Sequence, residues 1–106
     1  MRASLTMIGY TIGLAMAWFM YPVQANEALA SKYNCLICHA VDKKVTGPAY
    51  KDVAAKYKGD PHAIETLVQK VKNGGTGVWG NIPMPANSSV PDEDLKTLIQ
   101  WILSLQ

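Results

Sequence analysis

Residues 35–39 read C-L-I-C-H, and residues 82–85 read I-P-M-P. The chain of 106 residues contains two Cys, and both lie in the first stretch. Met84, in the second stretch, is the only one of the five Met that lies beyond residue 20. Residues three apart on a helical turn project from the same side, so Cys35 and Cys38 present two thiols together, with His39 next to them.

The pattern C-x-x-C-H is the sequence signal for covalent attachment of a c-type haem. The two thiols add to the two vinyl groups of one haem, and the following residue, His39, becomes the proximal ligand of the iron. The motif therefore predicts one covalently bound haem c per chain.

Three other interpretations of the same residues are less favoured but stay open. A redox-active dithiol expects a strand before the helix in a βαβ unit, and no such strand is predicted. A structural disulfide between Cys35 and Cys38 would close a very short loop and restrict little chain entropy. A zinc site needs four ligands, and the chain offers only Cys35, Cys38, His39 and the distant His62.

The first 25 residues have the features of a secretory signal peptide. Arg2 precedes an apolar run from Met7 to Met20, and no acidic residue occurs before Glu27. Val23-Gln24-Ala25 places small residues where a signal peptidase cleaves. The alternative is an uncleaved anchor, but the run is shorter than the roughly 20 residues that a membrane span requires. We expect a cleaved segment, 1–25, followed by one domain, 26–106.

The predicted mature domain is small and close to neutral. Lys and Arg together number ten, and losing Arg2 leaves nine basic side chains against eight acidic ones. No basic run is present that would follow a phosphate backbone, which argues against nucleic-acid binding. A domain of this size has a marginal hydrophobic core, so we expect a supplement such as a large apolar cofactor.

Hydrophobic periodicity predicts an all-α fold of four short helices, with no convincing strand. The helices are expected over 27–40, over 50–57, from Asp60 to Gly74, and from about Asp92 onward. Leu29, Tyr33, Leu36 and Ile37 form the apolar stripe of the first helix.

End signals support these bounds. Asn26 is predicted to cap the first helix, and Asp60-Pro61 to open the third. Gly59 and Gly74 are predicted to end the second and third helices.

The segment between the third and fourth helices reads N-G-G-T-G-V-W-G-N-I-P-M-P-A-N-S-S-V-P. Its four Gly and three Pro argue against a regular element. Long loops of this kind are usually functional or disordered, and Val78, Trp79, Ile82 and Met84 make this one too apolar for a disordered linker. The loop is therefore expected to pack on something that the helices do not supply.

The candidates for the second axial position are Met84, His62, a lysine, water or no ligand at all. His62 falls on the polar face of its helix, which favours an exposed surface residue. Pro83 and Pro85 stiffen the chain around Met84, which suits a weak thioether–iron bond that must be held in place. A filled sixth position with Met/His ligation raises the reduction potential and favours electron transfer over catalysis.

The order of motifs resembles a small bacterial class I cytochrome c. These motifs are C-L-I-C-H, V-T-G-P-A-Y-K-D-V-A-A-K-Y, V-K-N-G-G-T-G-V-W-G-N-I-P-M-P and a last helix ending W-I-L-S. The resemblance covers residues 26–106 and is nearest to the periplasmic cytochromes c of the five-fifty-one and five-fifty-two type. It implies four helices around one haem, with the long Gly/Pro-rich loop carrying the second axial ligand.

By this resemblance, Cys35 and Cys38 are the thioether anchors and His39 and Met84 the axial ligands. The Pro48 carbonyl would accept a hydrogen bond from Nδ1 of His39.

The resemblance also assigns three supporting residues. Asn87 would donate to the Met84 sulfur, Trp79 would bond a haem propionate, and Lys70 stands where some relatives place Arg beside that propionate. The chain departs from its relatives at Asn34, where Gly is usual, and at Ile37, where Ala is frequent. It also has one residue more between Met84 and the last helix.

The predicted function is a periplasmic, monomeric one-electron carrier with low-spin His/Met-ligated haem c, and not an enzyme. Its partners would be redox proteins, with nitrite reductase, a terminal oxidase or a cytochrome c peroxidase as candidates. After signal cleavage we expect no stable membrane insertion. The rival class is a haem enzyme or gas-binding protein, which needs an open sixth position and a distal acid–base group.

Overall fold

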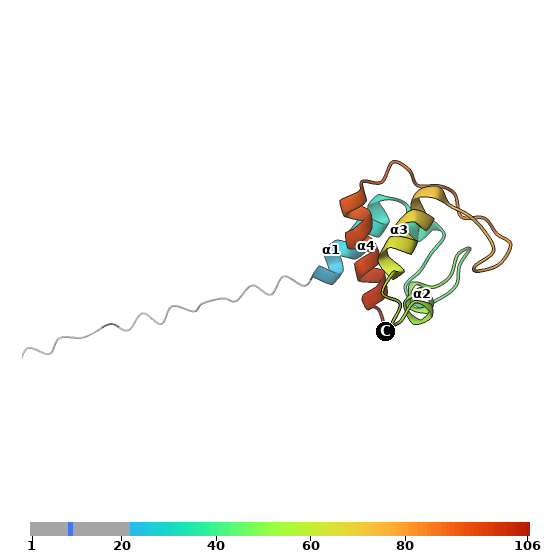
Figure 1. Ribbon diagram of the computed structural model, residues 1–106. Helices are drawn as coiled ribbons and strands as arrows, with labels where there is room; N and C mark the ends of the chain where they lie inside the picture. Colours follow the sequence, from blue (N-terminus) through green and yellow to red (C-terminus); the bar gives the residue numbers. More distant parts are fainter. Residues whose placement is uncertain (1–8, 10–21) are drawn as a thin grey trace, which may run out of the picture.

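The computed structural model describes Gly9 and residues 22–106. The helices in order are α1 (Pro22–Lys32), the short 3₁₀ helix η1 (Cys35–Ile37), α2 (Tyr50–Lys56), α3 (Ala63–Asn73) and α4 (Asp92–Ser104) (Figure 1). The described residues contain no β-strand, only one isolated bridge. The predicted all-α class and the four helices are confirmed, whereas most of the predicted signal peptide lies outside the described residues.

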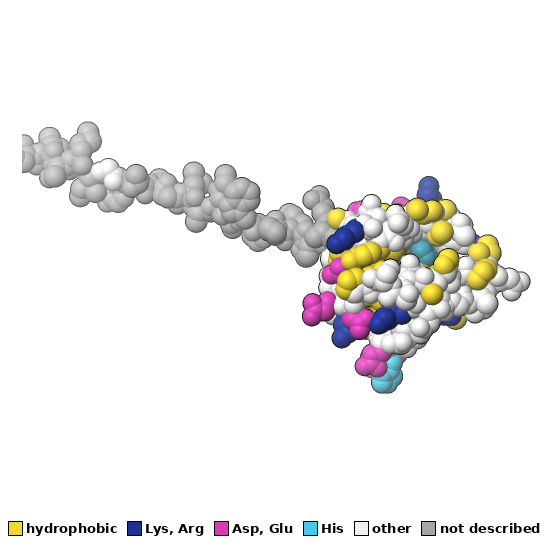
Figure 2. All heavy atoms as spheres, turned by 90° about the horizontal axis from the view of Figure 1, so that it is seen from above, with side chains coloured by type: hydrophobic (Ala, Val, Ile, Leu, Met, Phe, Trp, Pro, Cys, Tyr) yellow, Lys and Arg dark blue, Asp and Glu magenta, His cyan; other side chains and the backbone are white. Residues whose placement is uncertain are grey.

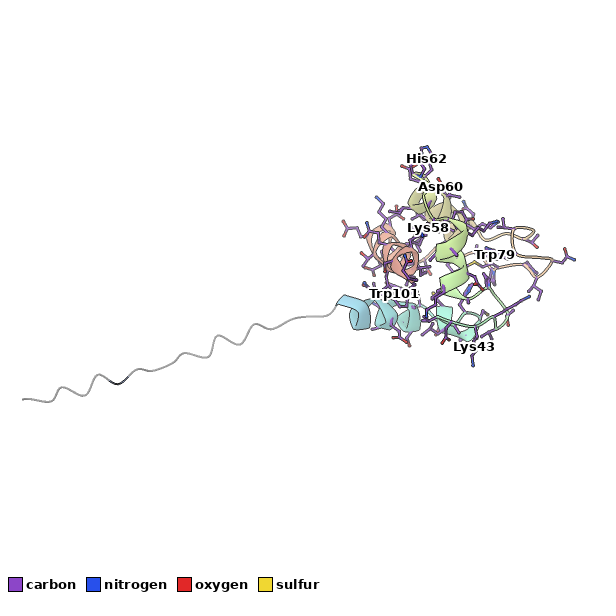
Figure 3. The ribbon with its side chains drawn as sticks, turned by 90° about the horizontal axis from the view of Figure 1, so that it is seen from below. Lys43, Lys58, Asp60, His62, Trp79 and Trp101 are labelled. Carbon is purple, nitrogen blue, oxygen red and sulfur yellow. The ribbon has the colours of Figure 1, made fainter. Side chains whose placement is uncertain are left out.

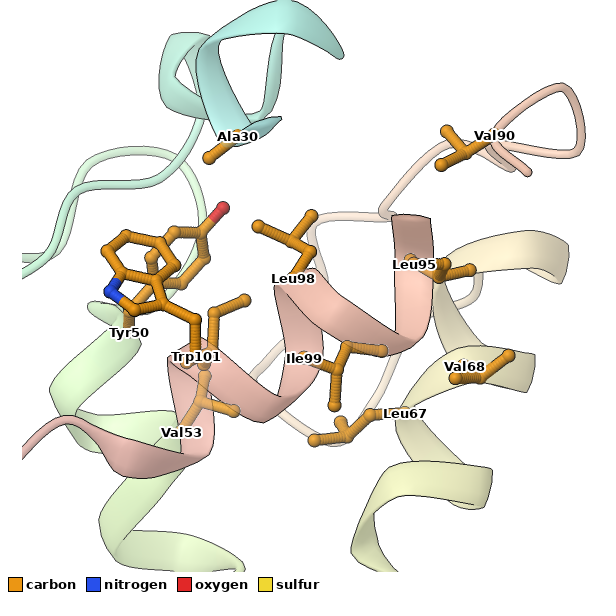
Figure 4. Packing of buried hydrophobic residues seen from close by; sticks show 11 residues of the cluster. Ala30, Tyr50, Val53, Leu67, Val68, Val90, Leu95, Leu98, Ile99 and Trp101 are labelled. Carbon is orange, nitrogen blue, oxygen red and sulfur yellow. The ribbon is translucent and has the colours of Figure 1, made fainter. Parts of the chain in front are cut away.

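Helix α4 is the centre of the packing, because α1, α2 and α3 all contact it. Leu95 and Ile99 on this helix are the largest fully buried side chains. They pack between α3 and the other helices, while Trp101 meets Tyr50 of α2 (Figure 4). The buried cluster consists of Ala30, Tyr50, Val53, Leu67, Val68, Val90, Leu95, Leu98, Ile99, Trp101 and Ile102.

The first helix ends earlier than the sequence pattern predicts. α1 stops at Lys32, and Asn34 adopts a left-handed conformation with φ of 61°. A left-handed residue reverses the helical path, so Cys35–Ile37 form a separate 3₁₀ turn with a new direction. The prediction that Ile37 continues the apolar stripe is wrong, since this side chain is 71% exposed.

Two helix starts also differ from the predictions. α1 begins at Pro22, so Asn26 lies inside the helix and does not cap it. α3 begins at Ala63, and Asp60 acts one turn earlier: its Oδ1 accepts a hydrogen bond of 2.8 Å from the backbone N–H of His62. The end of α3 is as predicted, with Lys70 and Lys72 in the last turn and Gly74 at a φ of 70°.

The loop between α3 and α4 is tied down by its own backbone. Gly75 and Met84 form an antiparallel bridge, with N–H to carbonyl distances of 3.0 and 2.8 Å. Asn87 donates its backbone N–H to the Val71 carbonyl at 2.9 Å. At Gly74 a Cβ would lie 2.5 Å from the Met84 carbonyl oxygen, so this glycine lets the two segments approach. The absence of a regular element here was predicted, but not this bridge.

Polar contacts join the ends of the helices. The Tyr33 hydroxyl donates to Asp94 Oδ2 at 2.5 Å, which links the end of α1 to the first turn of α4. This hydrogen bond raises the pKa of Tyr33. Lys72 pairs with Asp92, which connects α3 to α4 and lowers the pKa of the Asp92 carboxyl.

We predict that the left-handed conformation at Asn34 tolerates glycine but not a residue with a plain Cβ. Asn34→Gly should keep the stability of the haem-loaded protein, whereas Asn34→Ala should lower its free energy of unfolding by about 1 kcal/mol. Chemical unfolding followed by circular dichroism measures both. An Asn34→Ala variant as stable as the Gly variant would show that this backbone conformation is not required.

Candidate functional site

The C-L-I-C-H segment forms a compact turn that carries both thiols and the imidazole. The N–H groups of Cys38 and His39 both donate to the Cys35 carbonyl, at 3.3 and 3.0 Å. Cys35 and Cys38 are free thiols of intermediate exposure. Burial raises the pKa of the Cys35 thiol.

His39 is fixed by the loop that follows it. Its Nδ1 lies 2.9 Å from the Pro48 carbonyl oxygen, as the resemblance implied. Because a carbonyl oxygen can only accept, Nδ1 carries the proton and Nε2 is left with its lone pair free for a metal.

The loop that carries Pro48 is held in turn by backbone bonds. Gly47 donates to the Cys38 carbonyl at 2.7 Å, and Tyr50 donates to the Ala40 carbonyl at 2.9 Å. The acceptor of the His39 proton is therefore part of a rigid support built from residues 38–50.

Gly47 leaves room for the imidazole. A Cβ at this position would lie 2.4 Å from Cε1 of His39, 2.8 Å from Nδ1 and 3.0 Å from Nε2. Any side chain here would displace the ring. This close approach explains why a glycine stands at position 47, within T-G-P-A-Y.

Met84 sits in the loop between α3 and α4, with intermediate exposure. This loop and the loop from η1 to α2 lie on the same side of the molecule, away from the first residues of α1 (Figure 1). The structure thus brings the segment of His39 and the segment of Met84 to one side.

The three supporting residues have other protein partners in the structure. The Asn87 amide donates to the Pro85 carbonyl at 3.1 Å, and its predicted bond to the Met84 sulfur stays a prediction. The Trp79 ring lies under the ammonium group of Lys56, with 5.4 Å from Nζ to the ring centroid. Lys70 reaches the start of the loop, since a Cβ at Gly75 would be 2.8 Å from its Nζ.

His62 does not join this site. It is exposed, and it lies at the outer end of the molecule beside Asp60, away from Trp79 and Trp101 (Figure 3). A zinc site that includes His62 together with the two cysteines is therefore not formed.

Large hydrophobic side chains remain exposed around the two loops. In Figure 2, hydrophobic groups are frequent on the right, where both loops lie, while acidic groups are seen mainly at the lower left. The exposed large hydrophobic residues are Ile37, Val45, Val78, Trp79 and Ile82. The helices do not cover them, in agreement with the prediction that the loop packs on something else.

These residues fit a covalently held haem. The donor set contains two part-buried thiols on one turn, an imidazole with its Nδ1 already bonded, and a thioether on a loop tied at Gly75. Because Gly47 has no side chain, the imidazole has room for the position that it occupies. The surrounding apolar side chains suit a large, flat, apolar group.

Comparison with known proteins agrees with this site. Residues 23–106 match the family model described as Cytochrome c. The chain is 54% identical over 81 residues to cytochrome c-551 of Allochromatium vinosum, covering 76% of this chain and 86% of the relative. It is 53% identical over 78 residues to cytochrome c-551 of Pseudomonas aeruginosa, covering 74% of each.

Solved structures show the same fold. The crystal structure of Nitrosomonas europaea cytochrome c552 matches with a TM-score of 0.73 and 52% identity, over 76% of this chain and 99% of that one. The class 1 cytochrome MtoD from Sideroxydans lithotrophicus matches with a TM-score of 0.66 and 38% identity, over 78% and 95%.

The fold and the C-x-x-C-H site define an all-α haem protein. The chain belongs to the cytochrome c family, and within it to the small class I cytochromes c. It is an electron carrier with one covalently bound haem c, and its partners are redox proteins.

Sequence reasoning missed three residues of the site. Gly47, Tyr50 and Lys56 contact His39 or Trp79, yet none was singled out as a site residue. Gly47 directly precedes Pro48 and Tyr50 follows it by two residues. The predicted bond from His39 to the Pro48 carbonyl could therefore have pointed to both as neighbours of the ring. Lys56 lies far from Trp79 in sequence, and no local pattern joins them.

We predict that Gly47→Ala displaces the His39 ring, because the added methyl group would lie 2.4 Å from Cε1. The free energy of unfolding of the haem-loaded protein should fall by about 1–3 kcal/mol, as for other overpacked sites. Chemical unfolding monitored by haem absorption measures this loss.

The matched control is Thr46→Ala, which changes the exposed residue next to Gly47. It should leave the unfolding midpoint almost unchanged. Equal stability of Gly47→Ala and the native protein would mean that the ring does not need this space.

Proposed function

We propose that this chain is a periplasmic one-electron carrier, not an enzyme, whose haem iron is ligated by His39 and Met84. The observation that carries the proposal is the hydrogen bond from His39 Nδ1 to the Pro48 carbonyl, at 2.9 Å. When bound, the haem supplies a one-electron couple between Fe(II) and Fe(III). The residues of the chain hold, orient and shield it.

The support for His39 as a ligand is its tautomer and its position. A carbonyl acceptor fixes the proton on Nδ1, orients the ring and makes Nε2 more basic. Cys38, directly before His39, and Cys35, one turn earlier, would attach the haem on the same side of the chain. Covalent attachment and the bond from Nε2 then act together, so this side of the site is the permanent one.

The support for Met84 is the way its backbone is held. Both its N–H and its carbonyl bond to Gly75, and Pro83 and Pro85 flank it. Thioether–iron bonds are weak, so a ligand of this kind needs a backbone that loses little entropy on binding. Met84 is also the only methionine among the described residues.

A filled sixth position favours electron transfer over catalysis. A haem enzyme or gas-binding protein needs an open coordination position and an acid–base group beside it. His62, the other histidine of the chain, is exposed at the far end of the molecule (Figure 3). If His39 and Met84 held the iron in both oxidation states, the site would change little on electron transfer.

Trp79, Lys70 and Lys56 are suited to the carboxylates of the haem. Trp79 provides an indole N–H, and Lys56 places its ammonium group over the same indole ring. Lys70 brings a second cation to the start of the Met84 loop. Asn87, held by the Pro85 carbonyl, keeps a second amide N–H that can donate to the Met84 sulfur.

Electron exchange would take place through the exposed apolar side chains around the two loops. Ile37, Val78 and Ile82 are among them, and such a surface suits brief contact with a redox protein. A nitrite reductase, a terminal oxidase and a cytochrome c peroxidase are the candidate acceptors. We propose that the carrier is monomeric.

The proposed location follows from residues 1–25, interpreted as a cleaved signal peptide. None of the described helices has the length and hydropathy needed to cross a bilayer. Covalent haem attachment outside the bacterial cytoplasm agrees with such a signal.

We predict that Met84→Ala keeps the haem covalently attached but opens the sixth position. The weak charge-transfer band of ferric iron bonded to sulfur should disappear, added cyanide or imidazole should bind more readily, and the reduction potential should fall. Met84→His should restore low-spin iron at a potential below that of the native protein. Absorption spectra and redox titration measure these changes.

His62→Ala is the matched control and should leave the spectrum and the potential unchanged. If Met84→Ala retains both the charge-transfer band and the potential, Met84 is a packing residue and the sixth ligand must be sought elsewhere.

We also predict that the native protein begins at Asn26, because Val23-Gln24-Ala25 directs cleavage after Ala25. Mass spectrometry of the protein purified from its host should give the mass of residues 26–106 plus one haem. An intact chain that starts at Met1 and sediments with membranes would refute cleavage.

A further inference from the structure

The Tyr50 ring lies nearly flat against the imidazole of His39. The two ring centroids are 5.1 Å apart and the ring planes differ by 22°. This is a stacked contact within the range of favourable aromatic pairs. Tyr50 is 4% exposed, so it contacts His39 from inside the core and not from the surface.

Tyr50 is itself held from two directions. Its backbone N–H donates to the Ala40 carbonyl at 2.9 Å, which ties the start of α2 to the segment after His39. Behind it, the Trp101 ring of α4 packs edge-on, with centroids 5.8 Å apart and planes at 81°. A row of three rings thus connects His39 to the central helix.

Tyr50 and Trp101, the two rings behind His39, are both buried. The Trp101 indole is 4% exposed, and its Nε1 has no hydrogen-bond partner among the described residues. The Tyr50 hydroxyl lies in a buried setting near Cys35, and burial, together with that thiol, raises the pKa of Tyr50.

A metal bond at Nε2 and a hydrogen bond at Nδ1 fix the ends of the imidazole, but they do not fix its plane firmly. The ring can still turn about the line from the metal to Nε2, because a hydrogen bond tolerates bending. A second ring stacked on the imidazole face resists this rotation, since turning would drive one ring into the other. The backbone of Gly47 also lies close to the ring, along the edge formed by Nδ1, Cε1 and Nε2.

We propose that Tyr50 is a positioning residue that sets the plane of the His39 imidazole, with Trp101 as its support. The plane of an axial imidazole decides which iron d orbital it overlaps, and hence how the unpaired electron of the ferric state is distributed. A fixed plane also keeps the ligand geometry equal in both oxidation states. This inference rests on the proposed ligation of the iron by His39.

The test uses the haem-loaded protein with Tyr50→Phe and Tyr50→Leu. Tyr50→Phe keeps the stacked ring and removes only the hydroxyl, whereas Tyr50→Leu removes the ring. In the ferric state, electron paramagnetic resonance g values and the paramagnetically shifted proton signals of the His39 ring report its plane. We expect Tyr50→Phe to match the native protein and Tyr50→Leu to show shifted, broadened g values and moved ring signals.

Trp101→Leu should move the same signals in the same direction but by less, because it removes the support and not the stacked ring. Native g values and ring signals in a folded Tyr50→Leu variant would overturn the proposal. If that variant does not fold, nuclear Overhauser contacts between the Tyr50 and His39 rings in the reduced native protein decide. Their presence supports the proposal and their absence overturns it.

The same spectra separate this inference from the proposed function. If the native protein shows no paramagnetically shifted imidazole signals assigned to His39, then His39 is not the ligand and the proposed function fails first. If those signals are present but do not respond to Tyr50→Leu, only the role of Tyr50 is rejected.

Discussion

The hydrogen bond between His39 Nδ1 and the Pro48 carbonyl joins the cysteine turn to the loop that follows it. Neither segment belongs to a long helix, and neither has a core of its own. The bond works because Gly47 leaves space for the ring and because Gly47 and Tyr50 are tied by their N–H groups to carbonyls of residues 38–40. The geometry of the proximal side of the site follows from this one local arrangement.

The two sides of the site are held with different strength. On the side of His39, three protein contacts restrict the imidazole, from Pro48, Gly47 and Tyr50. On the side of Met84, the support is the backbone bridge to Gly75, with Asn87 bonded to Val71 a little further on. If Met84 is the sixth ligand, as we propose, its exchange should leave the haem attached, which is why this methionine is the informative residue to change.

The packing shows why a small protein benefits from its cofactor. The buried cluster is gathered on the central helix α4, whereas Val78, Trp79 and Ile82 in the long loop stay exposed. We expect a covalently bound haem to cover these side chains. Folding and cofactor attachment should then be coupled in a domain whose helices alone bury a limited core.

The sequence by itself determined the all-α class, the family and the haem cofactor, because these depend on local periodicity and on short motifs. C-L-I-C-H, the two prolines around Met84 and the glycine that ends α3 are all readable without a fold, whereas α2 ends at Lys56, three residues before the predicted stop at Gly59. The end of α1 was not predicted, because the apolar pattern continues past Asn34, which adopts a left-handed conformation in the structure. Tertiary structure alone decided the stacking of Tyr50 on His39, the placement of Lys56 over Trp79 and the bridge from Gly75 to Met84. These contacts join side chains or backbone from separate segments, and their geometry is set by how the helices pack on α4.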